Sequence, residues 1–186
     1  MARLPYVDPA TAPAPVRELL ERLPVQLNVF KMMAHAETNF APLMRLGASI
    51  LGHQQLDGRL RELAILRVAR LSAAEYEWQQ HVPIAAATGV TEAQVAALRR
   101  GEIDPACFDS TERLVLRFTT EVVQDAGASP RTVAAMQGRF SARELVELVV
   151  AIGFYMMVAR LMETTAIDLE APVGTVVVAA ARRQGV

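Results

Sequence analysis

The sequence predicts an all-α protein, a bundle of about eight helices formed by a single domain of residues 1–186. Hydrophobic residues make up 52% of the chain but aromatic residues only 5%, a composition that favours helices packed on helices over a sheet. Apolar residues recur at helical spacing, and the alternation that is typical of strands is almost absent. Several polar residues also stand where they would cap the start of a helix.

The N-terminal part of the chain is expected to form an irregular arm followed by three helices. Residues 1–12 lack a helical pattern, and the first 16 residues contain four prolines. Beyond this arm, apolar residues return at helical spacing. We therefore expect helices over about 13–23, 29–35 and 41–51.

The sequence predicts an antiparallel helix pair, over 59–71 and 73–88, at the centre of the fold. Asp57 is placed to cap the first of these helices, whose apolar residues form one stripe at helical spacing. Gly89 is a suitable residue to end the second helix. Pro83 lies within that helix, where it lacks a backbone donor and is expected to bend the axis.

Capping patterns predict the starts of four further helices. These patterns are Thr91 with Gln94, Asp109 with Glu112, Ser129 before Pro130, and Ser141 with Glu144. The C-terminal tail, residues 173–186, fits either a short helix or a loose arm.

The longest apolar segment, residues 145–162, is interrupted by Glu147 and Arg160. Two charges within about eighteen residues disfavour a membrane span, because each costs several kcal/mol at bilayer depth. We therefore expect a core helix, or one buried between subunits. The surplus of apolar surface on this helix predicts a homo-oligomer. Candidate interface residues are Met156, Met157 and Met162.

Charge and cysteine content exclude several classes of protein. The net charge is −1 with acidic and basic residues mixed, so no surface for nucleic acid and no polybasic segment for a membrane is expected. The single cysteine, Cys107, excludes an internal disulfide and a cysteine-rich metal site, and we interpret it as structural.

The N-terminus has no apolar run of signal-peptide length. We expect a cytoplasmic protein that binds a small molecule and needs no cofactor or metal.

The segment AEYEWQQH, residues 74–81, is the strongest candidate for a functional site. On a helix, Glu77 and His81 are four residues apart and lie on one face, about one turn from each other. Glu62 stands on the preceding helix and can approach this pair if the two helices are antiparallel. Three titratable groups in a partly desolvated pocket would shift one another's pKa values, as acid–base chemistry requires.

A structural role explains the same residues. A Glu–His pair four residues apart on a helix is often a surface contact worth a few tenths of a kcal/mol. Trp78 by itself fits a core residue, and Tyr76 could cover the seam between two helices with its hydroxyl in water. The spacing alone therefore leaves both interpretations open.

Residues 61–90, with the sequence RELAILRVARLSAAEYEWQQHVPIAAATGV, strongly resemble the signature region of the carboxymuconolactone decarboxylase family, which includes the AhpD-like alkylhydroperoxidases. A looser similarity extends from about residue 30 to residue 168 and includes Tyr155. The resemblance implies an AhpD-like helical bundle that associates into dimers, trimers or hexamers.

In the peroxidase branch, the family pattern is a glutamate, a Cys-x-x-Cys pair and a histidine, linked by a proton relay. On this chain the resemblance places the glutamate at Glu62 and the histidine at His81, with Tyr76 in place of a relay residue. The two cysteine positions fall on Ala74 and Glu77. Without a thiolate and its resolving partner, peroxide reduction at this site has no chemical basis. We therefore expect no cysteine-dependent alkylhydroperoxidase activity.

The decarboxylase branch of the family works without cysteines, so the resemblance implies an acid–base enzyme of the decarboxylase or lyase type. His81 is the candidate acid or base, Glu62 its orienting carboxylate, and Glu77 a second carboxylate. Candidate substrate-binding residues are Tyr76 and Trp78 in the pocket wall, Arg67 on the neighbouring helix, and Tyr155.

Two other functions fit the same residues. Glu62, Glu77 and His81 form a set of two carboxylates and one histidine that could hold a divalent ion, although the motif contains only one histidine. The loss of both cysteines also fits an oligomeric binding or scaffold protein that kept the pocket without its chemistry. The sequence does not name the substrate.

Overall fold

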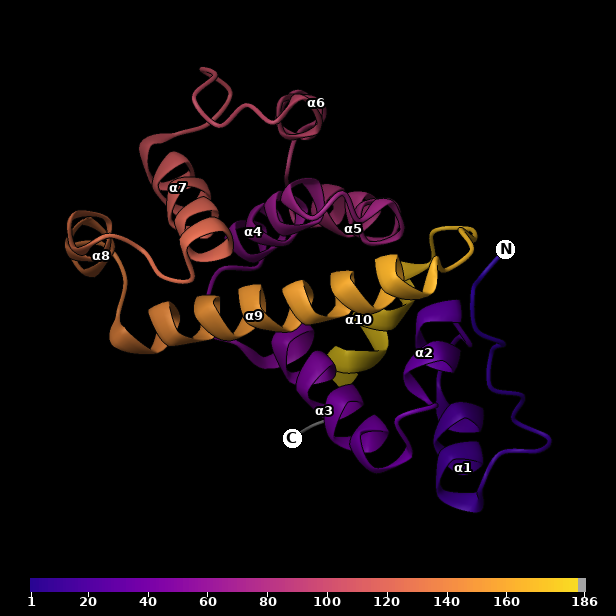
Figure 1. Ribbon diagram of the computed structural model, residues 1–186. Coiled ribbons are helices and arrows are strands. Elements are labelled where there is room, and N and C mark those ends of the chain that lie inside the picture. The colour runs from indigo at the N-terminus through magenta and orange to yellow at the C-terminus, as the bar shows by residue number, and fades with distance from the viewer. Residues whose placement is uncertain (184–186) are drawn as a thin grey trace.

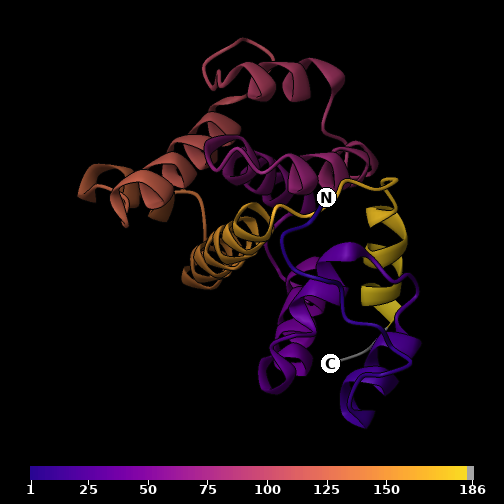
Figure 2. The ribbon, with the colours of Figure 1, turned by 45° about the vertical axis from the view of Figure 1, so that its right-hand side comes forward.

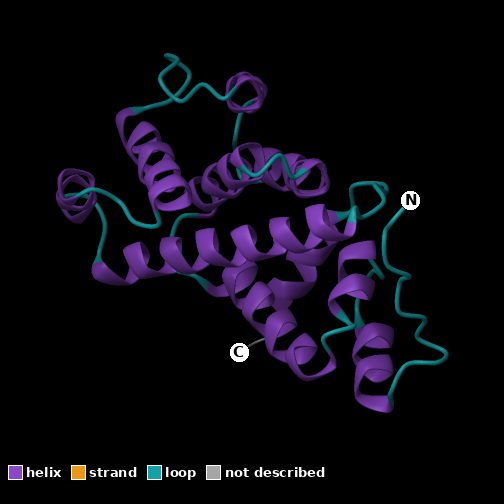
Figure 3. Cartoon of the chain, viewed as in Figure 1, coloured by secondary structure: helices purple, strands orange, loops and turns teal. Residues whose placement is uncertain are grey.

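The computed structural model describes residues 1–183 as a bundle of ten helices without strands (Figure 3). The predicted all-α fold class is confirmed, and the helices outnumber the eight expected. In chain order they are α1 (Ala14–Arg22), α2 (Asn28–Met33), α3 (Glu37–His53), α4 (Gly58–Leu71), α5 (Glu75–Ala87), α6 (Glu92–Arg100), α7 (Ser110–Asp125), α8 (Pro130–Gln137), α9 (Ala142–Thr165) and α10 (Gly174–Arg183).

Helix α9 crosses the middle of the molecule between two groups of helices (Figure 1, Figure 2). Helices α4 to α8 lie on one side of it, and α1, α2, α3 and α10 lie on the other. Three clusters of buried apolar side chains fill the spaces between the helices. The predicted central pair is α4 with α5, which pack against each other and are joined by residues 72–74.

The capping patterns predicted from the sequence are present at the helix starts. Thr91, Asp109 and Ser141 each accept a hydrogen bond from the backbone of the third helical residue, whose side chain bonds back to the cap. Asp57 and Ser129 cap α4 and α8 with their side chains. These local signals therefore fix where five of the helices begin.

Three other segments show how far local pattern predicts the fold. No helix begins before Ala14, in agreement with the predicted arm. Helix α3 extends beyond the predicted 41–51 at both ends and holds Pro42 inside. The ambiguous tail is helix α10, and residues 184–186 of that tail lie outside the described residues.

Helix α10 packs against both α3 and α5. Gly52 of α3 allows the close approach, because a Cβ there would lie 2.9 Å from backbone atoms of Ala181. Gln80 of α5 fixes the segment before α10. Its amide donates to the carbonyl of Ala171 at 3.1 Å and accepts from the N–H of Val173 at 3.0 Å. These contacts hold the C-terminal helix beside the central pair.

Helix α9 is, within residues 1–183, the one helix long and apolar enough to meet the criteria for a membrane span. It packs against α3, α4, α7 and α8, and residues such as Leu148 and Ile152 are fully buried. We therefore interpret α9 as a core helix of the bundle. Its opposite face carries the exposed apolar side chains of Val146, Val149, Val150 and Met157.

Candidate functional site

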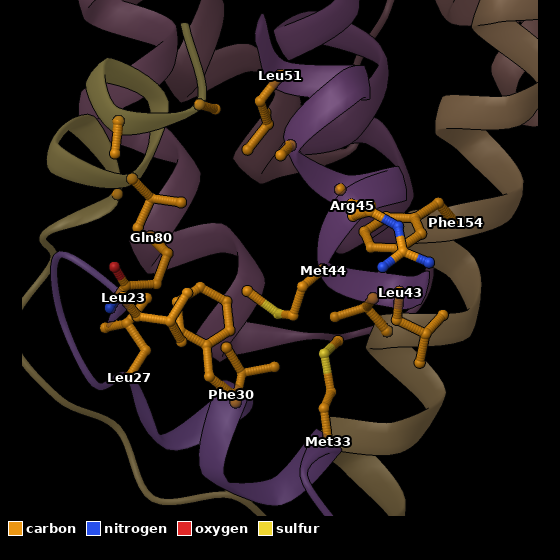
Figure 4. A pocket seen from close by; sticks show the side chains of 18 of the residues that line it. Leu23, Leu27, Phe30, Met33, Leu43, Met44, Arg45, Leu51, Gln80 and Phe154 are labelled. Atoms are coloured by element: carbon orange, nitrogen blue, oxygen red, sulfur yellow. The ribbon is translucent and has the colours of Figure 1, made fainter. Parts of the chain in front are cut away.

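A cavity of about 590 Å³ lies between α1, α2, α3, α5, α9 and α10 (Figure 4). Helix α5 contributes Tyr76, Glu77, Gln80, His81 and Ile84 to its wall. At about 100° per residue, these five positions fall within an arc of about 140° around the helix axis, so they lie on one side of α5. Most of the remaining wall is aliphatic or aromatic.

Glu62 and His81 form a hydrogen bond in the interior, as the arrangement of the two helices predicts. The Nδ1 atom of His81 lies 2.8 Å from Oε2 of Glu62, whose side chain is fully buried. Arg61 donates from Nε to the other oxygen of Glu62 at 3.2 Å, and from Nη1 to the carbonyl of Ile50 at 3.2 Å. The guanidinium thus compensates the buried charge of the Glu62 carboxylate.

Glu62 determines the tautomer of His81. A carboxylate only accepts hydrogen bonds, so the proton between the two side chains is carried by Nδ1, and a neutral imidazole then has its lone pair on Nε2. His81 lies on the cavity wall, whereas Glu62 lies behind it and does not line the cavity. Nε2 is therefore the ring nitrogen that remains for a ligand.

Glu77 is a buried carboxyl group without a hydrogen-bond partner. Its side chain is 2% exposed, and neither of its oxygens has a partner among the described residues. Burial, and then the negative charges of Glu62 and Glu163, raise the pKa of Glu77 well above its usual value. These conditions favour the neutral carboxylic acid, which can donate one hydrogen bond.

Tyr155 reaches the same part of the wall from α9. Its ring meets the imidazole of His81 edge to face, with the ring centroids 4.7 Å apart and the planes at 85°. Burial, and then the charges of Glu62 and Glu77, raise the pKa of Tyr155 well above its usual value. The hydroxyl therefore stays protonated and able to donate a hydrogen bond.

Tyr76 lines the cavity with its ring and holds the C-terminal segment with its hydroxyl. The hydroxyl donates a short hydrogen bond to Glu170 and accepts one from the N–H of Val29 at 3.5 Å. Burial and the contact with Glu170 raise the pKa of Tyr76. Tyr76 thus has the predicted place in the pocket wall, and its hydroxyl is engaged within the protein.

Trp78 and Arg67 lie away from the cavity, which corrects their predicted place at the site. At about 100° per residue, Trp78 falls outside the arc of α5 that holds the cavity residues. It packs in the apolar cluster between α4, α5 and α6, with the guanidinium of Arg99 5.1 Å from its ring centre. Arg67 donates hydrogen bonds to Thr120 and to the carbonyl of Gly101, both at 2.9 Å.

Other residues of the site are not predicted by the sequence. Arg61 adjoins Glu62 in the chain, and adjacent residues do not share a helix face, so spacing gives no signal for their ion pair. Helices α1, α2 and α3 and the segments between them supply wall residues such as Leu27, Phe30 and Met44 (Figure 4). The spacing of apolar residues in these segments indicates helices with an apolar face. It does not indicate which cavity that face lines.

Within residues 1–183, no group of three His, Cys, Asp or Glu side chains is arranged as a metal site. Glu62 is engaged by Arg61 and His81, and Glu77 forms a hydrogen bond with neither. The alternative of a divalent metal site therefore gains no support from this geometry.

A family model supports the sequence resemblance. The model described as "Carboxymuconolactone decarboxylase family" matches residues 38–121, a region that contains Glu62, Glu77 and His81. No curated protein matches the sequence.

Two solved structures share the arrangement of helices. One is an uncharacterised peroxidase-related protein from Ralstonia eutropha JMP134, described as an alkylhydroperoxidase AhpD core. It aligns with a TM-score of 0.76 and 16% identity over 97% of this chain and 96% of that chain. An uncharacterised peroxidase-related protein from Silicibacter sp. TM1040 aligns with a TM-score of 0.75 and 19% identity, over 91% of this chain and 92% of that chain. At these identities the similarity establishes an AhpD-like fold and nothing about activity.

Proposed function

We propose that this protein, whose residues 38–121 match the family model for carboxymuconolactone decarboxylases, is a cysteine-independent acid–base enzyme. Its reaction is of the decarboxylase or lyase type, on a small organic substrate that occupies the cavity beside α5 and α9. The buried pair of Glu62 and His81 supports this proposal, because it holds an imidazole in one tautomer next to a space for a ligand.

In the proposed reaction, His81 exchanges a proton with a carbon atom next to a substrate carbonyl. Nε2 takes the proton from this carbon, and the electron pair of the broken C–H bond moves onto the carbonyl oxygen as an enolate. Glu77 donates a hydrogen bond to that oxygen and thereby lowers the energy of the enolate. Glu62 is a positioning residue, since it acts only through the imidazole.

The enolate completes a lyase reaction when a leaving group on the next carbon departs with its bonding electrons. The enolate electrons form a carbon–carbon double bond, and the proton on His81 passes to the leaving group. In a decarboxylation, the bond from the carbon to a carboxylate breaks instead. Carbon dioxide leaves, and a protonated His81 gives its proton to the carbon.

A non-catalytic binding or scaffold protein is the second candidate. The largely apolar cavity supports it, because such a cavity binds small molecules without any chemistry. Peroxide reduction by a dithiol is not proposed, since the chain contains a single cysteine.

Proton exchange in heavy water tests the enzyme proposal without knowledge of the leaving group. The protein is incubated in D₂O with a panel of ketones, lactones and β-keto acids, and NMR follows exchange of the proton next to the carbonyl and any new product. We expect His81→Ala to slow the reaction at least about 100-fold. Glu62→Gln should lower kcat at least about tenfold and change KM less than about threefold, because it disturbs the tautomer of His81 and not the cavity.

His35→Ala is the matched control, because His35 is exposed and lies off the cavity wall. Its rate should equal that of the wild type. An unchanged rate in His81→Ala would contradict the proposal. Binding of panel compounds without exchange or turnover would favour the binding protein.

A further inference from the structure

The cavity is suited to a mainly apolar ligand. Its volume of about 590 Å³ lies in the range typical of ligand pockets and leaves room for about ten to twenty non-hydrogen atoms. Apolar side chains from α1, α2, α3 and the segments between them cover much of the wall, among them Leu23, Phe30, Met33 and Met44 (Figure 4). A ligand that fills this space must place most of its surface against hydrocarbon.

The charged residues of the wall do not provide a buried partner for an anion. Among the wall residues that the structure describes, the arginines are Arg22 and Arg45, both exposed, and no lysine is present. His53 also lines the cavity, and its Nε2 lies 3.0 Å from the carbonyl oxygen of Ala181. At the buried end, the carboxyl group of Glu77 lies beside His81, which is already bonded to Glu62. An anion at this end would lose its hydration beside the Glu77 carboxyl group and would meet no lysine and no buried arginine of the wall, which is unfavourable.

Glu77 indicates what kind of group occupies the buried end. Neither of its oxygens has a protein partner, although both are buried. Buried polar atoms are rarely left without a hydrogen bond, so a ligand is the natural partner. A carboxylic acid donates one hydrogen bond, and an uncharged oxygen acceptor can take it without bringing charge into the cavity.

We propose that this cavity binds an uncharged, mainly apolar carbonyl compound of about ten to twenty non-hydrogen atoms, with its carbonyl oxygen against Glu77 and its apolar part among the side chains of α1, α2 and α3. The choice of a carbonyl rests on the proposed function, because proton exchange at His81 needs a carbon next to a carbonyl. An uncharged substrate has no carboxylate to lose. The inference therefore selects the lyase reaction over decarboxylation.

Two probes of the same shape test the charge preference. 2-Nonanone and octanoate differ only in the replacement of a methyl group by a charged oxygen. Their affinities for the full chain are measured by calorimetry or ligand-detected NMR at neutral pH. We expect 2-nonanone to bind at least about tenfold more tightly than octanoate, because the anion finds no buried cation.

Variants at Glu77 test the hydrogen bond. Glu77→Gln keeps a donor for the carbonyl and should bind 2-nonanone within about threefold of the wild type. Glu77→Leu removes the donor and should weaken 2-nonanone about fivefold. Both variants should fold, because they replace a buried carboxyl group that has no partner. Glu75→Gln, at an exposed position of the same helix, is the matched control and should leave the affinity unchanged.

Three results would overturn the inference. The first is no binding of 2-nonanone at millimolar concentration. The second is an octanoate affinity equal to or higher than that of 2-nonanone, and a loss of this affinity in Arg45→Gln would then identify an acid held at the exposed arginines. The third is unchanged binding of 2-nonanone in Glu77→Leu.

These experiments distinguish a failure of the inferred ligand class from a failure of the proposed function. If 2-nonanone binds as expected but no panel compound exchanges a proton, the proposed function is wrong and the ligand class stands. If His81-dependent turnover occurs only with charged substrates, the ligand class is wrong and the acid–base proposal stands.

Discussion

At the scale of single residues, Glu77 is the most unusual side chain of the candidate site. It is buried without a partner, beside a carboxylate that already has two. Such an arrangement reduces the stability of the folded state, because a buried polar group without a hydrogen bond costs about 1–3 kcal/mol. A ligand that satisfies Glu77 would recover this free energy, which is why the residue is informative about function.

Glu77→Gln should change how stability depends on pH. The pKa of Glu77 is raised in the folded protein above its usual value of 4.5, so the folded state retains a proton that the unfolded state releases. The stability of the wild type therefore falls as pH rises above about 4.5, by up to about 1.4 kcal/mol per pH unit, until Glu77 ionises. Glutamine does not ionise, so the variant should gain stability relative to the wild type over this range.

Urea denaturation at fixed protein concentration, between about pH 4 and pH 8, measures this difference. Other titratable groups face Glu77, namely Glu62 and Glu163, with His81 and Tyr155 nearby on the same wall. The difference between variant and wild type, and not the wild-type curve alone, reports on Glu77. Parallel curves for the two proteins would contradict the prediction, and Glu75→Gln should give parallel curves.

The sequence predicts that Glu62 and His81 lie close together, because helical spacing is a local property. Glu77 and His81 share a helix face, and the short connection to the preceding helix brings Glu62 close to His81. Trp78 and Arg67, which the sequence suggests for the site, lie off the cavity wall, since a few residues along a helix rotate a side chain to another side. Which elements cover the far side of the cavity depends on tertiary packing, and no short segment encodes it.

At the scale of elements, a helix with a local signal at its start can be predicted from the sequence, whereas a helix positioned by tertiary contacts stays ambiguous. A cap needs only a few consecutive residues, so the starts of α6, α7 and α9 follow directly from the sequence. Helix α10 has no such signal, and its position depends on contacts with distant segments. One of these is its close approach to Gly52 of α3.

Gly52→Ala is expected to destabilise the protein by about 1–3 kcal/mol. Replacing glycine by alanine inside a helix normally stabilises it by up to about 1 kcal/mol. At Gly52, however, the new Cβ would lie 2.9 Å from backbone atoms of Ala181, so α10 must move away. Gly58→Ala is the control, because a Cβ there would meet its nearest atom at an ordinary 3.6 Å.

Urea denaturation of the two variants separates the steric effect from helix propensity. Gly58→Ala should be as stable as the wild type or slightly more stable. A Gly52→Ala protein with unchanged stability would mean that α3 and α10 do not approach as closely as described.

For the whole molecule, the two faces of α9 have different roles. One face packs in the core and carries Tyr155 into the cavity wall. The other exposes a row of apolar side chains, with Val146 62% and Val149 45% exposed. Of the methionines considered for an interface, Met157 belongs to this exposed face and Met162 lies in the core. A continuous apolar face of this kind is typical of an interaction surface.

We expect this face of α9 to join copies of the chain into a homo-oligomer. Val149→Lys places a charge in the middle of the face, and burying it in an interface without a partner would cost several kcal/mol. Light scattering at micromolar concentration should give a multiple of 20.3 kDa for the wild type and a mass near 20.3 kDa for the variant. Leu169→Lys, at another exposed apolar position but outside α9, should leave the mass unchanged. If the wild-type protein is already monomeric, the prediction is wrong, and the apolar face of α9 is exposed to water in solution.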